Sequence, residues 1–197
     1  MGRPRTVTNA QILRAAREIF IEQGPRAPTA VIAERLGLSQ AALFKRFGTK
    51  EELLMAAVRP PPPPWLAQVQ QGPDERPIPE QLKELGVQIA EFMDDLVPRM
   101  GVLHAAGIDP RKMMESDDVP PPIQNFASLK DWFRRAQAAG RIGPGKPETI
   151  TLSFLGALNA SAFFKHLARV SIGIPDREVL VDDLVELLWR SIAPSEG

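Results

Sequence analysis

The chain of 197 residues is long enough for one large domain or two small ones with a proper core, and 44% apolar with 24% charged residues is an ordinary composition for a soluble globular protein. The absence of cysteine excludes disulfides, thiolate metal sites and cysteine nucleophiles. No apolar run approaches the roughly 18 residues of a membrane span, and the polar N-terminus lacks the apolar segment of a secretory signal. We therefore expect a soluble cytoplasmic protein.

The net charge is zero, but the charged residues are unevenly distributed along the chain. Residues 1–59 contain ten basic and five acidic residues, whereas the remainder contains 14 basic and 19 acidic ones. A basic head on an acidic body indicates a head that binds a polyanion, with nucleic acid as the favoured partner. A chance fluctuation in composition is the plain alternative.

Four helices are predicted in the basic head. The first two are located by the residues that begin and end them. The first should be capped by Asn9 and ended by Gly24, with its apolar residues three and four apart on one face. The second should be capped by Thr29, directly after Pro28. Gly37 then supplies a sharp turn, because glycine adopts a positive φ without steric cost.

The third and fourth predicted helices follow that turn closely. Ser39 is placed to cap the third helix, whose residues Leu43 and Phe47 lie four apart and should face inward. Thr49 should cap the fourth, with Glu52 completing a capping box. Two short helices around a glycine turn, with a helix before and after, form a helix-turn-helix arrangement, in which the second short helix lies in the DNA major groove.

The residue types on the third predicted helix suit contact with DNA. Ala41 and Ala42 are small, so they let the helix backbone approach the base edges. Gln40 can offer paired hydrogen bonds to adenine, and Lys45 or Arg46 can reach guanine or phosphate. Free N–H groups at the starts of the helices are natural phosphate ligands.

The N-terminal region resembles the DNA-binding domain of the TetR family of bacterial transcriptional regulators over about residues 8–58. The likeness rests on the segments ILRAAREIFIEQG, IAERLGLSQAALFKRF and GTKEELL at close to the family's spacing. The resemblance implies a homodimer whose larger domain binds a small molecule and which releases DNA when that site is occupied.

The resemblance also implies roles for single residues. Thr29 and Lys50 match residues that contact phosphate, and Ser39 matches the residue that opens the recognition helix. Phe44 stands where the family usually has a tyrosine whose hydroxyl binds phosphate, and this chain contains no tyrosine at all, so we expect van der Waals contact there. The expected DNA-binding residues are Thr29, Ser39, Gln40, Ala41, Ala42, Phe44, Lys45, Arg46 and Lys50.

Proline divides the rest of the chain into helical segments. The segment RPPPPPW at residues 59–65 should be a stiff polyproline II connector, because each proline lacks an N–H and clashes with the preceding turn. Between the other breaks the pattern is helical, and no alternating Val/Ile/Thr run predicts a sheet. We expect an all-α fold of about nine helices, divided into a helix-turn-helix domain at 1–58 and a helical effector-binding and dimerisation domain at 59–197.

The last two helices are the predicted dimer interface. Their apolar faces, within residues 148–173 and 177–193, are wider than one core contact requires, so two copies would form a four-helix bundle across a two-fold axis. The alternative is that both helices are buried within one monomer. The expected interface residues are Phe154, Leu155, Leu158, Ala162, Leu184, Leu188 and Trp189.

A pocket for an unknown small apolar effector is expected between residues 85–107 and 123–140. Methionine and aromatic side chains suit an adaptable apolar cavity, although at helical spacing they also form plain core, and His104 fits a hydrogen-bonded core position. The expected lining residues are Phe92, Met93, Met100, His104, Phe126, Trp132 and Phe133.

No catalytic motif is present. The two histidines, His104 and His166, have no serine or carboxylate partner at a motif spacing, and the adjacent acids at 94–95 and 182–183 point to different helix faces. We expect no enzyme activity, no cofactor and no metal. The sequence therefore predicts a homodimeric, ligand-responsive repressor of a palindromic operator. The alternative is a helical small-molecule-binding or adaptor protein that has lost operator binding, which Phe44 and a shortened second helix keep open.

Overall fold

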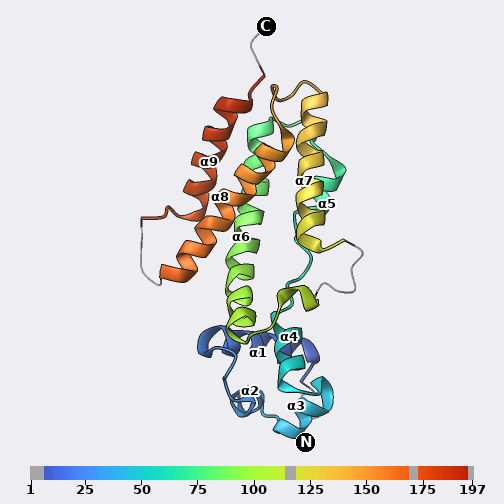
Figure 1. Cartoon of the computed structure of the whole chain (residues 1–197), viewed down its shortest axis with the longest axis vertical. Helices are drawn as coiled ribbons and strands as arrows, with labels where there is room; N and C mark the ends of the chain where they lie inside the picture. The colour runs from blue at the N-terminus through green and yellow to red at the C-terminus, as the bar shows by residue number, and fades with distance from the viewer. Residues whose placement is uncertain (1–6, 114–118, 169–172, 195–197) are drawn as a thin grey trace, which may run out of the picture. The chain divides into compact units, whose positions relative to one another are not determined.

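The computed structural model describes residues 7–113, 119–168 and 173–194, and these residues form helices joined by turns, with no strand among them (Figure 1). This confirms the all-α prediction. The helices are α1 (Asn9–Gln23), α2 (Thr29–Arg35), α3 (Gln40–Phe47), α4 (Lys50–Val58), α5 (Leu66–Gln71), α6 (Ile78–Ala105), the short 3-10 helix η1 (Pro110–Met113), α7 (Pro121–Ala138), α8 (Pro147–Ala168) and α9 (Arg177–Ile192).

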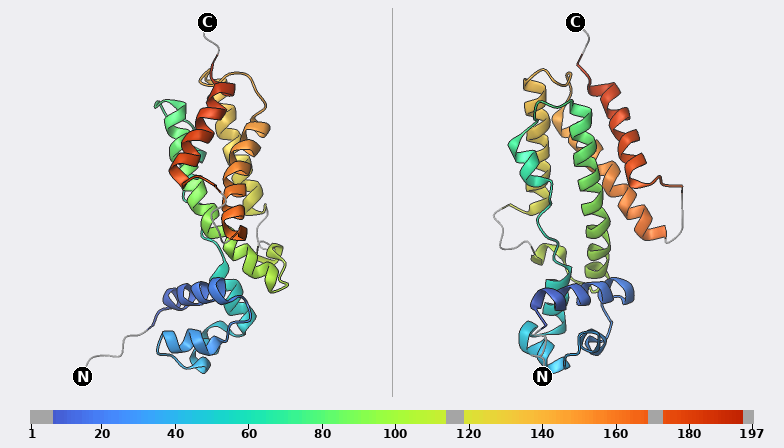
Figure 2. Two further views of the ribbon diagram at one scale, coloured as in Figure 1. Left: turned by 90° about the vertical axis from the view of Figure 1, so that its left-hand side faces the viewer. Right: turned by 180° about the vertical axis from the view of Figure 1, so that it is seen from behind.

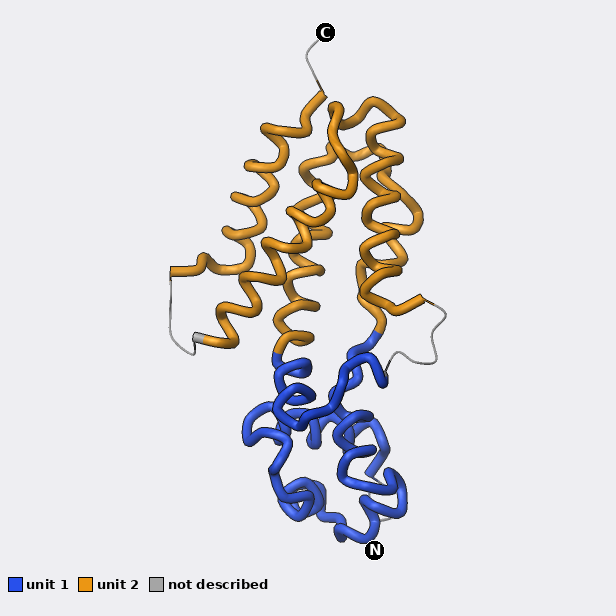
Figure 3. Tube along the Cα trace, in the orientation of Figure 1, with its two compact units in different colours: residues 1–61, 98–116 blue, residues 62–97, 117–197 orange. Residues whose placement is uncertain are grey.

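The chain divides into two compact units (Figure 3). Unit 1 comprises residues 1–61 and 98–116, and unit 2 comprises residues 62–97 and 117–197. Residues 98–113, which contain the end of α6, therefore pack with the N-terminal helices, although they lie far beyond residue 58 in the sequence. None of the helices in the described residues is both long and apolar enough to cross a membrane.

Unit 1 is built on the packing of α1 against α4, with α2 and α3 completing the bundle. Its core contains fully buried side chains from every one of these helices, among them Phe20, Ile32, Leu43 and Leu53. Leu103 of α6 is also fully buried in this core. Burial of each such side chain contributes roughly 1.5–3 kcal/mol, which is why the short helices α2 and α3 are stable here but would not be in isolation.

The starts of the first two helices differ from the sequence prediction by one residue. Thr8, not Asn9, caps α1: its side chain accepts from the backbone N–H of Gln11, whose own side chain accepts in return from Thr8. Pro28 occupies the N-cap position of α2, so Thr29 is the first helical residue and not the cap. Proline at that position fixes φ, and the threonine side chain is left free for another partner.

The turn between α2 and α3 and the next two caps follow the prediction. Gly37 has a φ of 65°, which only glycine adopts readily. The hydroxyl of Ser39 accepts from the N–H of Ala42 at 3.2 Å. Thr49 and Glu52 form the predicted capping box at the start of α4. Hydrogen bonds from Thr49 lower the pKa of the exposed Glu52 carboxyl, which therefore stays ionised at the positive end of the helix dipole.

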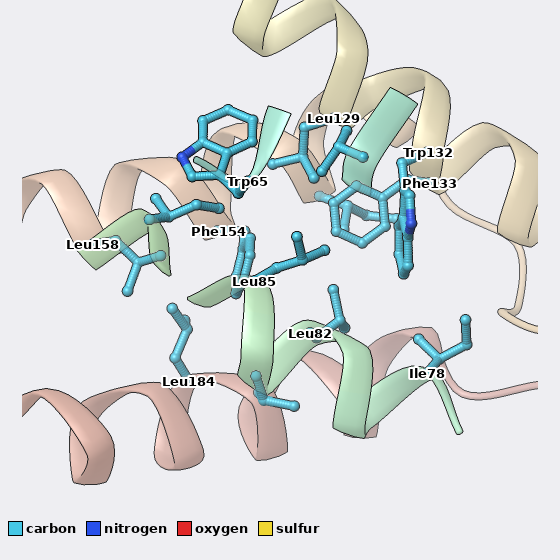
Figure 4. Close-up of a cluster of buried hydrophobic side chains, with 14 of the residues drawn as sticks. Trp65, Ile78, Leu82, Leu85, Leu129, Trp132, Phe133, Phe154, Leu158 and Leu184 are labelled. Carbon is cyan, nitrogen blue, oxygen red and sulfur yellow. The ribbon is translucent and has the colours of Figure 1, made fainter. Parts of the chain in front are cut away.

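Unit 2 is a bundle in which α7 packs against α5 and α8, and α8 packs against α9. The right-hand view of Figure 2 shows α5 beside α7 and α8 beside α9. The core of unit 2 is rich in aromatic side chains (Figure 4). The rings of Trp132 and Phe133 meet edge to face with centroids 5.3 Å apart, and those of Phe133 and Phe154 meet in the same way at 6.4 Å. Gly86 permits a close approach of α6 and α9, because a Cβ there would lie 2.7 Å from a methyl group of Val181.

Candidate nucleic-acid interface

Helix α3 has one buried and one exposed side. Leu43 is completely buried in the core of unit 1, and Phe47 packs against the same core. The side chains of Gln40, Ala41, Phe44, Lys45 and Arg46 are exposed on the other side. Phe44, a large apolar group, is 36% exposed. The structure therefore confirms the predicted inward side of α3, with Leu43 and Phe47, and its outward polar side.

The N-terminal turn of α3 leaves backbone donors free. Ser39 satisfies the N–H of Ala42, and the N–H of Leu43 donates to the carbonyl of Ser39. The N–H groups of Gln40 and Ala41 make no hydrogen bond to any described residue. These two groups point along the positive end of the helix dipole, so they can donate to a phosphate oxygen.

Thr29, which is predicted from the sequence to contact phosphate, is the first residue of α2, and only 6% of its surface is exposed. The side-chain amide of Gln40 donates from Nε2 to Thr29 Oγ1 at 3.1 Å, so the hydroxyl already has a partner on the neighbouring helix. The structure thus brings together two residues that the sequence prediction had assigned separate DNA contacts.

The two basic residues at the end of α3 differ in their surroundings. Arg46 donates from Nη1 to the backbone carbonyl of Val7 at 2.6 Å and lies 3.5 Å from Asn9 Oδ1, so it ties α3 to the segment before α1. The exposed Lys45 has no ion pair with any described residue. Lys50 lies in the first turn of α4 and is half-buried. Lys45 and Lys50 therefore make no ion pair with any described residue, whereas Arg46 uses Nη1 for Val7 and Asn9 and keeps its other N–H donors.

A surface depression in unit 1 has a volume of about 520 Å³ and lies between the first turn of α4 and the end of α6. Three of its lining side chains are cationic. It is lined by Pro25, Arg26, Lys50, Glu51, Leu54, Ala105, Ala106, Gly107, Ile108 and Lys112. Arg26 and Lys112 were not predicted as site residues, and no motif in the sequence marks them.

The predicted effector residues are not brought together around one cavity. Trp132 and Phe133 are buried in the core of unit 2 and Met93 packs against that core, whereas Met100 packs against the core of unit 1. Phe92 and Phe126 are half-buried. His104 is exposed, so the structure does not place it in a hydrogen-bonded core. Neither this depression nor a smaller one on α9 is lined by any of these residues.

The predicted dimer residues divide into two groups. Phe154, Leu158, Ala162 and Leu184 are buried within the subunit. Leu155, Leu188 and Trp189 are partly buried and pack against the core of unit 2. The large apolar side chains that α8 and α9 expose are Leu152, Phe163, Phe164, Leu167, Val179 and Leu187, none of which is among the predicted interface residues. No group of three or more metal-ligating side chains is found in the described residues.

Comparisons with known proteins agree with this geometry. Residues 12–57 match the family model of bacterial regulatory proteins of the tetR family. A bacterial regulatory protein of the tetR family from Rhodococcus RHA1 is 20% identical, with a TM-score of 0.64 over 96% of this chain and 100% of that one. The TetR family regulator PfmR from Thermus thermophilus is 20% identical, with a TM-score of 0.63 over 91% of this chain and 97% of that one.

A third solved structure, described as the molecular basis for control of antibiotic production by bacterial hormones, is 24% identical, with a TM-score of 0.65 over 96% of this chain and 100% of that one. At these identities the likeness establishes the fold. The match at residues 12–57 identifies this part of the chain, which contains α2, the glycine turn and α3, as a helix-turn-helix of the tetR family of bacterial regulatory proteins.

Phe44 provides the first test of this interface. The change Phe44→Tyr adds a hydroxyl to a side chain that is already exposed, and one hydrogen bond to a charged phosphate contributes about 1.5–3 kcal/mol. We expect DNA binding to tighten by roughly ten- to 100-fold, measured by fluorescence anisotropy with a labelled duplex. Phe44→Leu is the control and should not tighten binding. An unchanged affinity for Phe44→Tyr would mean that this side chain does not reach the DNA backbone.

Proposed function

We propose that this chain is a sequence-specific repressor that binds a palindromic operator as a homodimer and is released from it by a small apolar molecule. The observation that supports operator binding is the outward face of α3, where Gln40, Ala41 and Phe44 are exposed beside two free backbone N–H groups. A helix with this face fits the major groove, with small residues next to the bases and donors next to the phosphates.

Phosphate contact by Lys50 gives a quantitative test of operator binding. We expect the wild-type protein to prefer its operator, selected from a random DNA pool, over random duplex, with an affinity that falls steeply as salt rises. Lys50→Ala should weaken binding to all sequences alike and reduce the slope of log K against log salt by about one.

Lys146→Ala is the matched control, because Lys146 is an exposed lysine of unit 2 outside the proposed interface. It should leave the slope unchanged. A wild-type protein that binds without sequence preference would contradict the repressor proposal and favour a helical ligand-binding or adaptor protein.

The exposed apolar side chains of α8 support homodimerisation. Leu152, Phe163 and Leu167 are 62%, 49% and 65% exposed and lie on one face of the helix, at spacings of 11 and 4 residues. Between them lies Gly156, where an added Cβ would meet nothing within 4 Å, so the backbone is open to close approach. The neighbouring helix α9 adds Leu187, which is 65% exposed. An apolar face of this kind on a monomer indicates an interaction site, and a second copy would cover it with a two-fold symmetric bundle.

Two substitutions on α8 separate the interface from the core. Leu167→Glu should give a folded monomer, because the charge disrupts an apolar interface while the side chain lies outside the core. Leu158→Glu should instead prevent folding, since Leu158 is 1% exposed. Sedimentation velocity at micromolar concentration measures the first effect and circular dichroism the second. A monomeric wild-type protein, or a Leu167→Glu variant that remains dimeric, would contradict this interface.

The effector part of the proposal is supported by buried polar atoms in unit 2. The indole Nε1 of Trp65 and the hydroxyl of Ser161 are buried and have no hydrogen-bond partner among the described residues. Buried donors are normally satisfied, because an unsatisfied one costs about 1–3 kcal/mol. A small apolar molecule with a hydrogen-bond acceptor would supply the missing partner inside the aromatic core that holds Trp65, Trp132 and Phe133. The similar structure described for control by bacterial hormones also fits response to a small signal.

A thermal-shift screen of apolar, acceptor-bearing aromatic compounds tests this effector site. A compound at 100 times its Kd should stabilise the folded protein by about 2.7 kcal/mol, and the same compound should release labelled operator DNA. Trp65→Phe removes the indole N–H and keeps most of the ring, so it should weaken binding of the compound while the protein stays folded. Compounds that stabilise the protein without releasing DNA, or that bind Trp65→Phe equally well, would contradict the proposal.

A further inference from the structure

We propose that Thr29 is a positioning residue for base readout: its buried hydroxyl holds the side-chain amide of Gln40 so that the free edge of the amide reads adenine at one position of each half-site. This inference rests on the proposed operator binding. It gives Thr29 a different role from the phosphate contact that the family resemblance implies.

The hydrogen bond joins the first residues of two successive helices. Thr29 is the first residue of α2 and is 6% exposed, and Gln40 is the first residue of α3 and is exposed. Gln40 Nε2 donates to Thr29 Oγ1 at 3.1 Å across the glycine turn. One end of the amide is therefore fixed against the interior of unit 1, and the rest of it faces outward.

The free part of the amide has the pattern that adenine requires. A glutamine amide carries two N–H donors and one carbonyl acceptor. One N–H is committed to Thr29, and the other N–H and Oε1 make no hydrogen bond to any described residue. In the major groove adenine presents the N7 acceptor beside the N6 donor, so one glutamine N–H and its carbonyl oxygen pair with both.

The hydrogen bond to Thr29 matters because a glutamine amide without it can present its donor and its acceptor in either order. Rotation by half a turn about the last side-chain bond exchanges the donor and the acceptor, and an exposed glutamine also has freedom about its other bonds. A hydrogen bond to Thr29 selects one orientation before DNA arrives. The ordering cost is then met in the free protein, so the bidentate contact to adenine retains more of its discrimination.

The alternative role, a direct phosphate contact by Thr29, makes a different demand on the structure. A phosphate contact uses the hydroxyl as a donor at the surface, whereas Thr29 is only 6% exposed and its hydroxyl accepts from Gln40. A phosphate contact would also add affinity for every sequence alike, because phosphates carry no sequence information. The two roles therefore differ in a measurable quantity, the preference for adenine at one operator position.

The test compares Thr29→Val, which keeps the shape of the side chain but cannot accept, with Thr29→Ser, which keeps the hydroxyl. Full-length proteins are titrated with the operator selected by the wild type and with its single-base-pair variants. The position read by Gln40 is the one whose preference is lost in Gln40→Ala. A 7-deazaadenine duplex, which removes only the N7 acceptor, probes the bidentate contact directly.

At that position we expect the wild type and Thr29→Ser to prefer adenine over 7-deazaadenine by about tenfold. In Thr29→Val the preference should fall to about twofold, with other positions unchanged. The double variant Thr29→Val with Gln40→Ala should discriminate no less than Gln40→Ala alone, because the threonine acts only through the glutamine.

Three outcomes would overturn the inference. An equal loss of affinity for all sequences in Thr29→Val would indicate a phosphate or purely structural role. An unchanged adenine preference would show that Gln40 needs no anchor. If Thr29→Val does not fold, a wild type that binds 7-deazaadenine and adenine operators equally well still contradicts bidentate readout. Failure of the proposed function is distinguishable, because the wild type would then prefer no operator at all.

Discussion

The complete burial of Leu43 in the core of unit 1 is the constraint on which the candidate interface depends. Successive residues of an α-helix are rotated by about 100°, so fixing one side chain inside fixes the direction of all the others. With Leu43 inside, Gln40, Ala41, Phe44 and Lys45 face outward. The glycine turn and the Ser39 cap set where α3 begins, and the core sets which side of it is available to DNA.

Because local caps and one buried residue set the position and orientation of α3, unit 1 could be predicted in detail from the sequence. Caps and turns depend on residues within a few positions of one another, so Ser39, Gly37 and the Thr49–Glu52 box have local signals. The errors there were also local: Thr8 and Asn9 can both cap a helix, and the choice was made by Gln11, which completes a capping box with Thr8 alone. By contrast, the hydrogen bond from Arg46 to Val7 spans 39 positions, and no local pattern signals it.

The C-terminal helices were harder to predict because α8 carries apolar residues on more than one side. A helix that is apolar all round packs against more than one partner, and periodicity alone cannot assign each side to the subunit core or to another chain. Phe154 and Leu158 face the aromatic core, whereas Leu152 and Leu167 are exposed. The sequence therefore identified the helix that carries a surplus of apolar residues, but it did not separate the residues buried in the subunit core from the exposed ones. The predicted effector residues have the same ambiguity, since methionine and aromatic side chains fill cores and cavities equally well.

The roles of the polar residues also depend on where each side chain lies, and not only on its residue type. A threonine at a helix start can donate to a phosphate, and a glutamine can pair with adenine. Both assignments assume that the side chain has no other hydrogen-bond partner. Thr29 is buried, and its hydrogen bond to Gln40 turns two independent contacts into one coupled unit. A coupled pair can carry sequence information that neither residue carries alone, because the buried partner fixes which atom of the amide donates and which accepts. In the proposed readout, sequence preference at this surface therefore depends on Thr29 through its hydrogen bond to Gln40.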